Sequence, residues 1–207
     1  MTRLIILCFT LLLAQPAMSI EEPDYTVIEQ SGKLELRRYA PTIIAETRVS
    51  GSMDKASGDG FRLIADYIFG NNTAPNGEQS KISMTAPVLM EPQSEKINMT
   101  APVTLAETGG DWRVAFVMPS HYTMETLPTP NNDQVTLREV PASDYAVVRF
   151  SGLAGEKKVA KKTSELLQWM KSKSLIPVGS PELARYNPPW TPPFLRRNEI
   201  RVQYSGL

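Results

Sequence analysis

Hydrophobic and polar residues alternate in a short segment that the chain carries twice. Residues 81–88 (KISMTAPV) and 96–103 (KINMTAPV) begin 15 positions apart and differ at one position. In the first copy Ile82, Met84 and Ala86 fall on one face, which is the period of a half-buried strand. Residues 91–95 (EPQSE), between the copies, are polar and suit a turn. The pattern therefore predicts a β-hairpin whose methionines face an apolar surface.

A longer and weaker repeat covers two segments of 18 residues. Residues 34–51 align without gaps on residues 135–152, and six of the aligned pairs are identical. Each copy holds two apolar stretches around a Pro-containing turn and ends in Ser-Gly. We therefore expect two strands in each copy.

An amphipathic helix is predicted after each copy of the long repeat. Apolar residues recur at helical spacing from Phe61 to Ile68, and residues 70–72 (GNN) suit a helix end. A second stripe runs from Val159 to Met170, with lysines largely off it. Further strands are predicted at residues 112–118, 183–186 and 199–204.

This order of elements predicts an α+β fold made of two tandem, pseudo-symmetric strand-helix-strand repeats, at about residues 25–130 and 131–207. Two such halves can join their sheet edges into a distorted antiparallel β-barrel with the two main helices packed outside. An arrangement of this kind leaves a groove between the halves. Apolar grooves with a few polar groups are the usual places for small ligands.

The first 19 residues have the pattern of a secretory signal peptide. Arg3 precedes an apolar run from Leu4 to Leu13, and small residues suit cleavage after Ser19. The run is too short for a permanent transmembrane helix. We expect residues 1–19 to be removed and residues 20–207 to form a single exported, soluble domain, in the periplasm or the medium. A buried N-terminal helix or strand is the alternative.

Cysteine content and charge exclude several functions. The one cysteine, Cys8, would leave with the signal peptide, so the exported chain would have no disulfide and no cysteine ligand for a metal. Removal of Arg3 lowers the basic count from 22 to 21 against 22 acidic residues, which gives a net charge of −1. This balance does not favour nucleic acid as a partner, and no second apolar stretch has the length of a membrane span.

Four segments together resemble the SOUL haem-binding protein family, and the resemblance extends from about Tyr25 to Tyr204. They are listed in chain order as LRRYAP at residues 36–41, KISMTAPV at residues 81–88, VMPS at residues 117–120, and PP at residues 188–189 with RRNEI at residues 196–200. The resemblance implies a distorted β-barrel from a duplicated unit, as in gyrase-inhibitor-like effector-binding domains. It also implies reversible binding of haem or a related tetrapyrrole. One subgroup of the family places an axial histidine directly before the tyrosine of the first segment, and Arg38 stands there in this chain. The chain resembles the members that hold the porphyrin by apolar contact and basic groups.

Six residues are candidates for the ligand site: Arg38, Tyr39, Arg48, Met84, Met99 and His121. The arginines could bind a propionate bidentately, or could be solvated strand residues. The tyrosine and the methionines could contact iron or fill the core. His121 is the one imidazole and so a weak candidate for an axial metal ligand, although a loop histidine is more often solvated.

Other functions stay open on sequence grounds. A binding module for another small amphipathic ligand is the main alternative. A hydrolase is a further one, but Glu46, Glu91, Glu125 and Glu139 have no spacing that defines an acid–base pair. No catalytic constellation is visible. The Pro-rich turn from Asn187 to Phe194 could bind a protein partner or serve as a rigid connection.

Overall fold

The computed structural model describes residues 20–93 and 110–205. Its elements, in chain order, are β1 (Tyr25–Ser31), β2 (Leu34–Tyr39), β3 (Thr42–Ser50), α1 (Met53–Ile68), β4 (Asn72–Thr73), β5 (Val88–Gln93), β6 (Asp111–Val117), β7 (Thr129–Pro130), β8 (Thr136–Val140), β9 (Ser143–Ser151), α2 (Glu156–Ser172), β10 (Ile176–Pro177), β11 (Glu182–Arg185), a 3₁₀ turn η1 (Pro193–Leu195) and β12 (Arg197–Ser205). The expected signal peptide lies outside the described residues. Among those described, no helix is long and apolar enough to cross a membrane.

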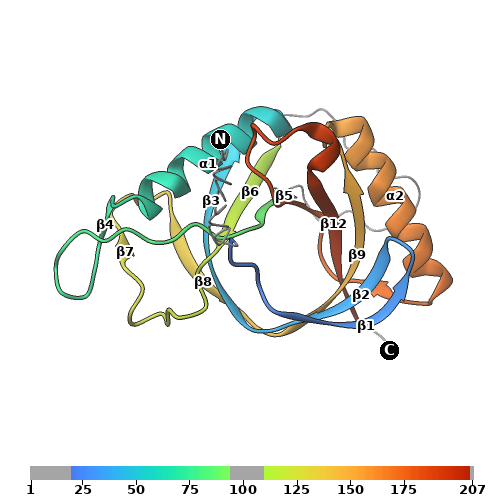
Figure 1. Ribbon diagram of the computed structural model, residues 1–207, viewed down its shortest axis with the longest axis horizontal. Coiled ribbons are helices and arrows are strands. Elements are labelled where there is room, and N and C mark those ends of the chain that lie inside the picture. Colours follow the sequence, from blue (N-terminus) through green and yellow to red (C-terminus); the bar gives the residue numbers. More distant parts are fainter. Residues whose placement is uncertain (1–19, 94–109, 206–207) are drawn as a thin grey trace, which may run out of the picture.

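One strongly curled antiparallel sheet forms a half-barrel, and both helices lie on its outside (Figure 1). The strand order is β1-β2-β9-β12-β11-β5-β6-β3-β8, with β10 paired to β12. The helices bury their apolar stripes against the convex face, where Ile64 of α1 and Leu166 of α2 are fully buried. The predicted α+β fold class, with two outer helices, is confirmed.

The sheet has an internal two-fold pattern that follows from the long repeat. Leu36 pairs with Ala146 across β2 and β9, and Ala45 pairs with Leu137 across β3 and β8. Leu36 corresponds to Leu137 in the repeat, and Ala45 corresponds to Ala146, so the two pairs are equivalent. The halves meet where β5 pairs with β11, with Leu183 opposite Met90. The repeat read from the sequence thus places corresponding strands at symmetric positions in one sheet.

Local sequence explains how α1 sits on the sheet. The Ser52 side chain caps the first turn by accepting a hydrogen bond from the Lys55 backbone N–H at 3.4 Å. Gly70, with a φ of 125°, ends the helix region, as predicted. Gly60 faces β6 so closely that an added Cβ would lie 2.6 Å from the Val114 side chain. A glycine is therefore needed for the helix to approach the strand.

The hairpin predicted from the short repeat is wrong in its first half. Residues 81–87 contain one isolated bridge, from Thr85 to Glu21, and the strand β5 begins only at Val88. Residues 91–93, expected in the turn, belong to β5, and the second copy lies outside the described residues. The cause is that residues 81–87 pair with other elements: the Ile82 N–H bonds to the Ile68 carbonyl at 2.9 Å, and the Ala86 N–H to the Glu21 carbonyl at 2.9 Å.

The burial predicted for Met84 is also wrong. Ile82 and Ala86 are 3% and 5% exposed, as an inward face requires, but Met84 is 37% exposed. Thr85, expected on the polar face, is buried, and its hydroxyl donates to the Val117 carbonyl. Strict alternation fails because the segment is not held in a strand ladder.

Candidate functional site

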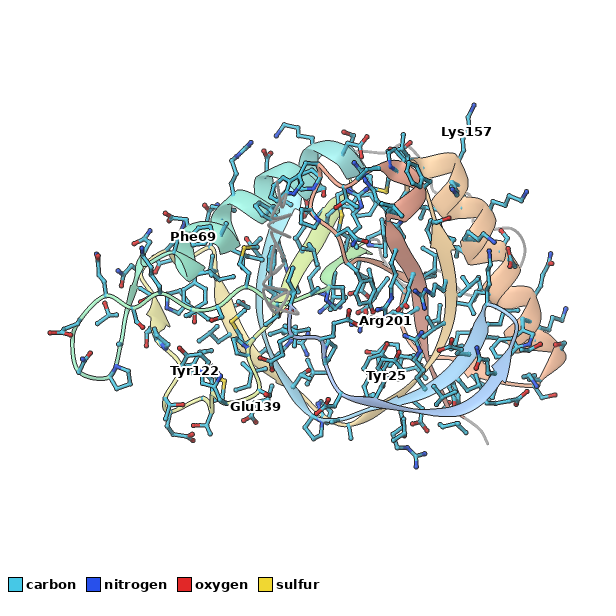
Figure 2. The ribbon with its side chains drawn as sticks, viewed as in Figure 1. Tyr25, Phe69, Tyr122, Glu139, Lys157 and Arg201 are labelled. Carbon is cyan, nitrogen blue, oxygen red and sulfur yellow. The ribbon has the colours of Figure 1, made fainter. Side chains whose placement is uncertain are left out.

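Two adjoining cavities share part of their lining, and the smaller one lies inside the curl of the sheet. The smaller has a volume of about 240 Å³ and the larger about 610 Å³. Residues common to both walls are Pro23, Ala40, Thr42, Val117, Val140 and Pro141. Figure 2 shows Arg201, which lines the smaller cavity, inside the curl of the sheet, and Tyr122 and Glu139 of the larger cavity near its open edge. We call the two adjoining cavities together the groove.

A chain of ion pairs forms the floor of the smaller cavity. Arg113 of β6 donates to Glu46 at 3.1 Å, to Glu91 at 2.7 Å and to Glu182 at 2.7 Å. Arg138 of β8 donates two hydrogen bonds to the Glu46 carboxylate, both at 3.0 Å. The β5–β11 pairing brings Glu91 and Glu182 together, since they follow Met90 and Leu183 in its register.

Arg201 extends the same chain towards the tyrosines of β2 and β9. Its Nε donates to Glu182 at 2.5 Å, and its guanidinium lies 4.8 Å from the ring centre of Tyr145 and 5.5 Å from that of Tyr39. This is cation–π geometry. Three arginines therefore face three glutamates, and the charges of the floor balance.

Burial and pairing act on the carboxyl groups in opposite directions. Burial raises the pKa of Glu46, but the hydrogen bonds from Arg138 and Arg113 outweigh it and hold that pKa below its ordinary value. For Glu91 burial prevails over the attraction of Arg113, so its pKa lies above the ordinary value. Of these two carboxyl groups, Glu91 takes up a proton first as the pH falls.

A second polar cluster fixes β2 to β12 beneath the groove. Arg37 donates to the two carboxylate oxygens of Glu199 at 2.9 and 3.2 Å, and the Tyr186 hydroxyl donates to Glu199 at 2.7 Å. Arg37 is 1% exposed and Glu199 is fully buried. Burial raises the pKa of Glu199, but the hydrogen bond and charge of Arg37 outweigh it, so the pKa lies below its usual range. This cluster is inaccessible to a ligand and holds the sheet together.

The candidate residues that the structure describes lie at separate places. Tyr39 lines the smaller cavity, where its hydroxyl accepts a hydrogen bond from Arg37 at 3.0 Å. Arg38 faces solvent and grips Asp144 with two bonds of 2.8 Å, and Arg48 is exposed. His121 is exposed and its ring lies 4.2 Å from that of Tyr122, which lines the larger cavity.

The two methionine candidates are not among the described walls of the groove. Met84 is partly exposed and lines neither cavity, and Met99 lies outside the described residues. Arg38, Arg48 and His121 are likewise absent from the described walls of both cavities.

The groove is more polar than the sequence predicted. We expected an apolar crevice, but its smaller cavity is lined by Arg113, Arg138, Arg201, Glu91 and Glu182. Glu46 and Glu91 were candidates from the sequence only as carboxylates without a defined acid–base partner. The long repeat held one further signal, because Arg138 is an identical partner of Arg37 in the alignment. Both arginines turn towards the inside of the curl and bind a buried or half-buried glutamate.

Comparison with known protein families matches nearly the whole chain to one of them. The family model described as "SOUL heme-binding protein" covers residues 20–203. The chain belongs to the SOUL haem-binding protein family. The family's ligands are haem and related tetrapyrroles, which makes a tetrapyrrole the ligand class for this SOUL chain. None of the curated proteins matches it.

Solved structures similar to this SOUL chain share its fold at low sequence identity. The crystal structure of the EcmrR C-terminal domain superposes with a TM-score of 0.62 at 12% identity and covers 88% of this chain and 99% of that one. A structure titled as a hydrolase from Listeria innocua has a TM-score of 0.55 at 13% identity, covering 86% and 94%. An uncharacterised conserved protein from Listeria innocua has a TM-score of 0.56 at 15% identity, covering 84% and 92%. At these identities the likeness extends to the fold alone.

Proposed function

We propose that this chain binds haem or a related tetrapyrrole reversibly in the groove formed by the two cavities. The observation that carries the proposal is the larger cavity of about 610 Å³, within the range of about 300–1,000 Å³ that is usual for small-ligand sites. Ile43, Val117, Met118 and Val140 supply apolar wall for a flat ring. Burial of that ring against these side chains is the main source of affinity.

The charges of the groove set the orientation of the ligand. None of the described residues that line the larger cavity is an arginine or lysine, and Glu21, Glu22, Asp24 and Glu139 are among them. Ligand carboxylates are therefore repelled there and turn towards the smaller cavity. The guanidinium of Arg138 is the accessible one, because its side chain is 45% exposed, whereas that of Arg113 is 15% exposed. Arg138 can add a ligand carboxylate to its bond with Glu46.

The proposed binding mode assigns no iron ligand. No histidine occurs among the described residues that line either cavity. Binding of this kind depends on the ring and its carboxylates and assigns no role to the iron. A bound haem would supply a redox-active iron, with chemistry that belongs to the cofactor. An iron-free porphyrin should consequently bind about as well as haem.

A titration of the purified protein with haem, followed by the shift of the Soret band, tests the proposal. Saturable binding that persists in His121→Ala is expected. Arg138→Glu should weaken binding by about tenfold or more, because a charged hydrogen bond contributes about 1.5–3 kcal/mol. Arg48→Glu is the matched control, since Arg48 is an exposed arginine outside both cavities, and it should bind normally. Absence of a saturable shift, or equal weakening by both variants, contradicts the proposal.

Competition distinguishes the other small amphipathic ligands that this fold could hold. A compound that displaces protoporphyrin IX and binds more tightly would make the tetrapyrrole a surrogate. For a hydrolase, Glu91 is the carboxyl of the groove whose pKa is raised, and turnover lost in Glu91→Gln would support that rival.

We further propose that the chain is exported and loses residues 1–19. Its support is the signal-like sequence alone: Arg3, the apolar run and the small residues before Ile20. N-terminal sequencing of the protein from its native host tests this, with Ile20 as the expected first residue. An intact Met1 or Thr2 in the native protein contradicts it.

A further inference from the structure

The loop between β11 and β12 carries a concentration of exposed apolar side chains. Residues 187–195 (NPPWTPPFL) contain no charged residue. Trp190 is 82% exposed, Phe194 is 75% exposed and Leu195 is 62% exposed. Large apolar side chains this accessible on one loop commonly mark an interaction surface. The groove proposed for the tetrapyrrole does not use them.

Hydrogen bonds to backbone carbonyls, together with prolines, hold this loop in one shape. Arg196 donates to the Thr191 carbonyl at 2.7 Å and also to the Pro189 carbonyl. The Leu195 N–H donates to the Pro192 carbonyl at 2.9 Å, and four prolines fix φ along the segment. The exposed side chains are therefore held outward before any contact forms, which lowers the entropy lost on binding.

A further exposed leucine and several cations lie beside the loop. The Asn198 side chain donates to the Gly152 carbonyl at 2.9 Å, which places Leu153, 61% exposed, next to the start of β12. The segment also meets α2, because Lys158 donates to the Ser151 carbonyl at 2.6 Å. Figure 2 shows Lys157 projecting from the beginning of α2 at the same upper edge of the molecule.

The charge around this patch is positive. The neighbouring cations are Lys157, Lys158 and Arg196, and the neighbouring carboxylates are Glu156 and Asp54. Asp54, at the start of α1, is balanced by Arg185 at 3.7 Å. The N-terminal ends of both helices also point to this edge, and they add partial positive charge (Figure 1).

We infer that the patch of Leu153, Trp190, Phe194 and Leu195 docks on the surface of a lipid bilayer that contains anionic headgroups. Exposed aromatic and aliphatic side chains on a loop held by prolines suit insertion into the interfacial region, where tryptophan is favoured. Neighbouring lysines and arginine suit the headgroup phosphates. The positive charge beside the patch favours an anionic bilayer surface as its partner.

Tryptophan fluorescence tests the inference without depending on how the N-terminus behaves. Trp112→Phe and Trp169→Phe leave Trp190 as the one tryptophan of the three. Vesicles of phosphatidylglycerol and phosphatidylcholine should shift its emission to the blue, and brominated lipids should quench it. Replacing Trp190, Phe194 and Leu195 by serine, in the chain that keeps Trp112 and Trp169, should weaken vesicle binding at least about tenfold, as expected for apolar area withdrawn from lipid.

Two charge variants sharpen the test. Lys157→Glu should weaken binding to the anionic vesicles by about fivefold or more, because each surface cation contributes about 1 kcal/mol. Lys81→Glu, at an exposed lysine before β5, is the control and should change binding less. Vesicle binding without quenching of Trp190 overturns the inference, because another part of the chain then makes the contact. An emission shift that depends on protein concentration and not on vesicles also overturns it, and assigns the patch to a second copy of the chain.

Discussion

The buried pair of Arg37 and Glu199 offers the sharpest test of how the half-barrel is held together. Replacement of Arg37 by Leu keeps an apolar stem but removes the guanidinium that donates to Glu199, Glu35 and Tyr39. Glu199 then stays fully buried with fewer partners. Its remaining hydrogen bonds come from Tyr186 at 2.7 Å and Arg197 at 3.0 Å.

The size of the loss follows from what remains around Glu199. Breaking a buried ion pair by removing one partner costs about 3–5 kcal/mol, because the other charge is left uncompensated. Arg197 still compensates Glu199 in part, so we expect the lower end, about 3 kcal/mol of the free energy of unfolding. The double variant Arg37→Leu with Glu199→Leu should recover most of that loss, since no buried charge then remains.

The loss should depend on pH in a defined direction. The pKa of Glu199 is held below its ordinary value, so its ionised form stabilises the fold at neutral pH, and this contribution is lost as the pH falls through that low pKa. Without Arg37 burial dominates and the pKa of Glu199 rises. In the variant, Glu199 therefore takes up a proton at a higher pH, which removes the cost of its buried charge. The difference in stability from the unsubstituted protein should narrow as the pH falls from 7 to 5.

Urea unfolding followed by circular dichroism at both pH values measures this gap. Arg38→Leu is the matched control, because Arg38 is the next residue of β2 and also grips a carboxylate bidentately, but is solvent-exposed. It should lose much less stability. A loss below about 1 kcal/mol in Arg37→Leu would refute the reasoning, because an exposed ion pair can contribute that much. So would a gap that is the same at pH 7 and pH 5.

Three further predictions concern packing and charge. Gly60→Ala should lower the free energy of unfolding by about 1–3 kcal/mol through overpacking against β6, whereas Gly58→Ala, with open space around it, should be neutral or stabilising by up to about 1 kcal/mol; thermal unfolding of both variants decides this. Thr47→Val should stabilise by about 1 kcal/mol, because the buried Thr47 hydroxyl lacks a hydrogen-bond partner among the described residues; an unchanged or lower melting temperature would contradict it. Arg138→Gln should raise the pKa of Glu46 towards its ordinary value, measured by NMR titration of the side-chain carboxyl; an unchanged pKa would mean that Arg138 does not set it.

The sequence predicted the fold well where local pattern and long repeat agreed. The copies at residues 34–51 and 135–152 became β2–β3 and β8–β9, and the helices follow each copy. Apolar periodicity decides these elements, because it fixes which face of each meets the core. The short repeat misled because period-two alternation says nothing about a partner strand. Residues 81–87 alternate, yet their hydrogen bonds go to α1 and to the N-terminal segment.

The site was less predictable because its charges meet only through the curl of the sheet. Arg113, Glu182 and Arg201 come from three strands, and no local motif joins them. Arg113 and Glu182 are 69 residues apart, and Glu182 and Arg201 are 19 residues apart. A buried charge looks the same in sequence as a solvated one. Glu46 and Arg48 alternate with buried neighbours, which predicts that both lie on the same face of the sheet. Whether that face is open to solvent or curled inward depends on the tertiary fold.

The central claim is that a tetrapyrrole occupies the groove, and amide chemical-shift mapping with protoporphyrin IX tests it most directly. We predict saturable shifts at the walls of the groove, in the amides of residues 40, 42, 43, 117, 118, 120 and 138–140, with little change along α1 or α2. Shifts confined to the helices or to residues 187–195, or no saturation at all, would contradict it.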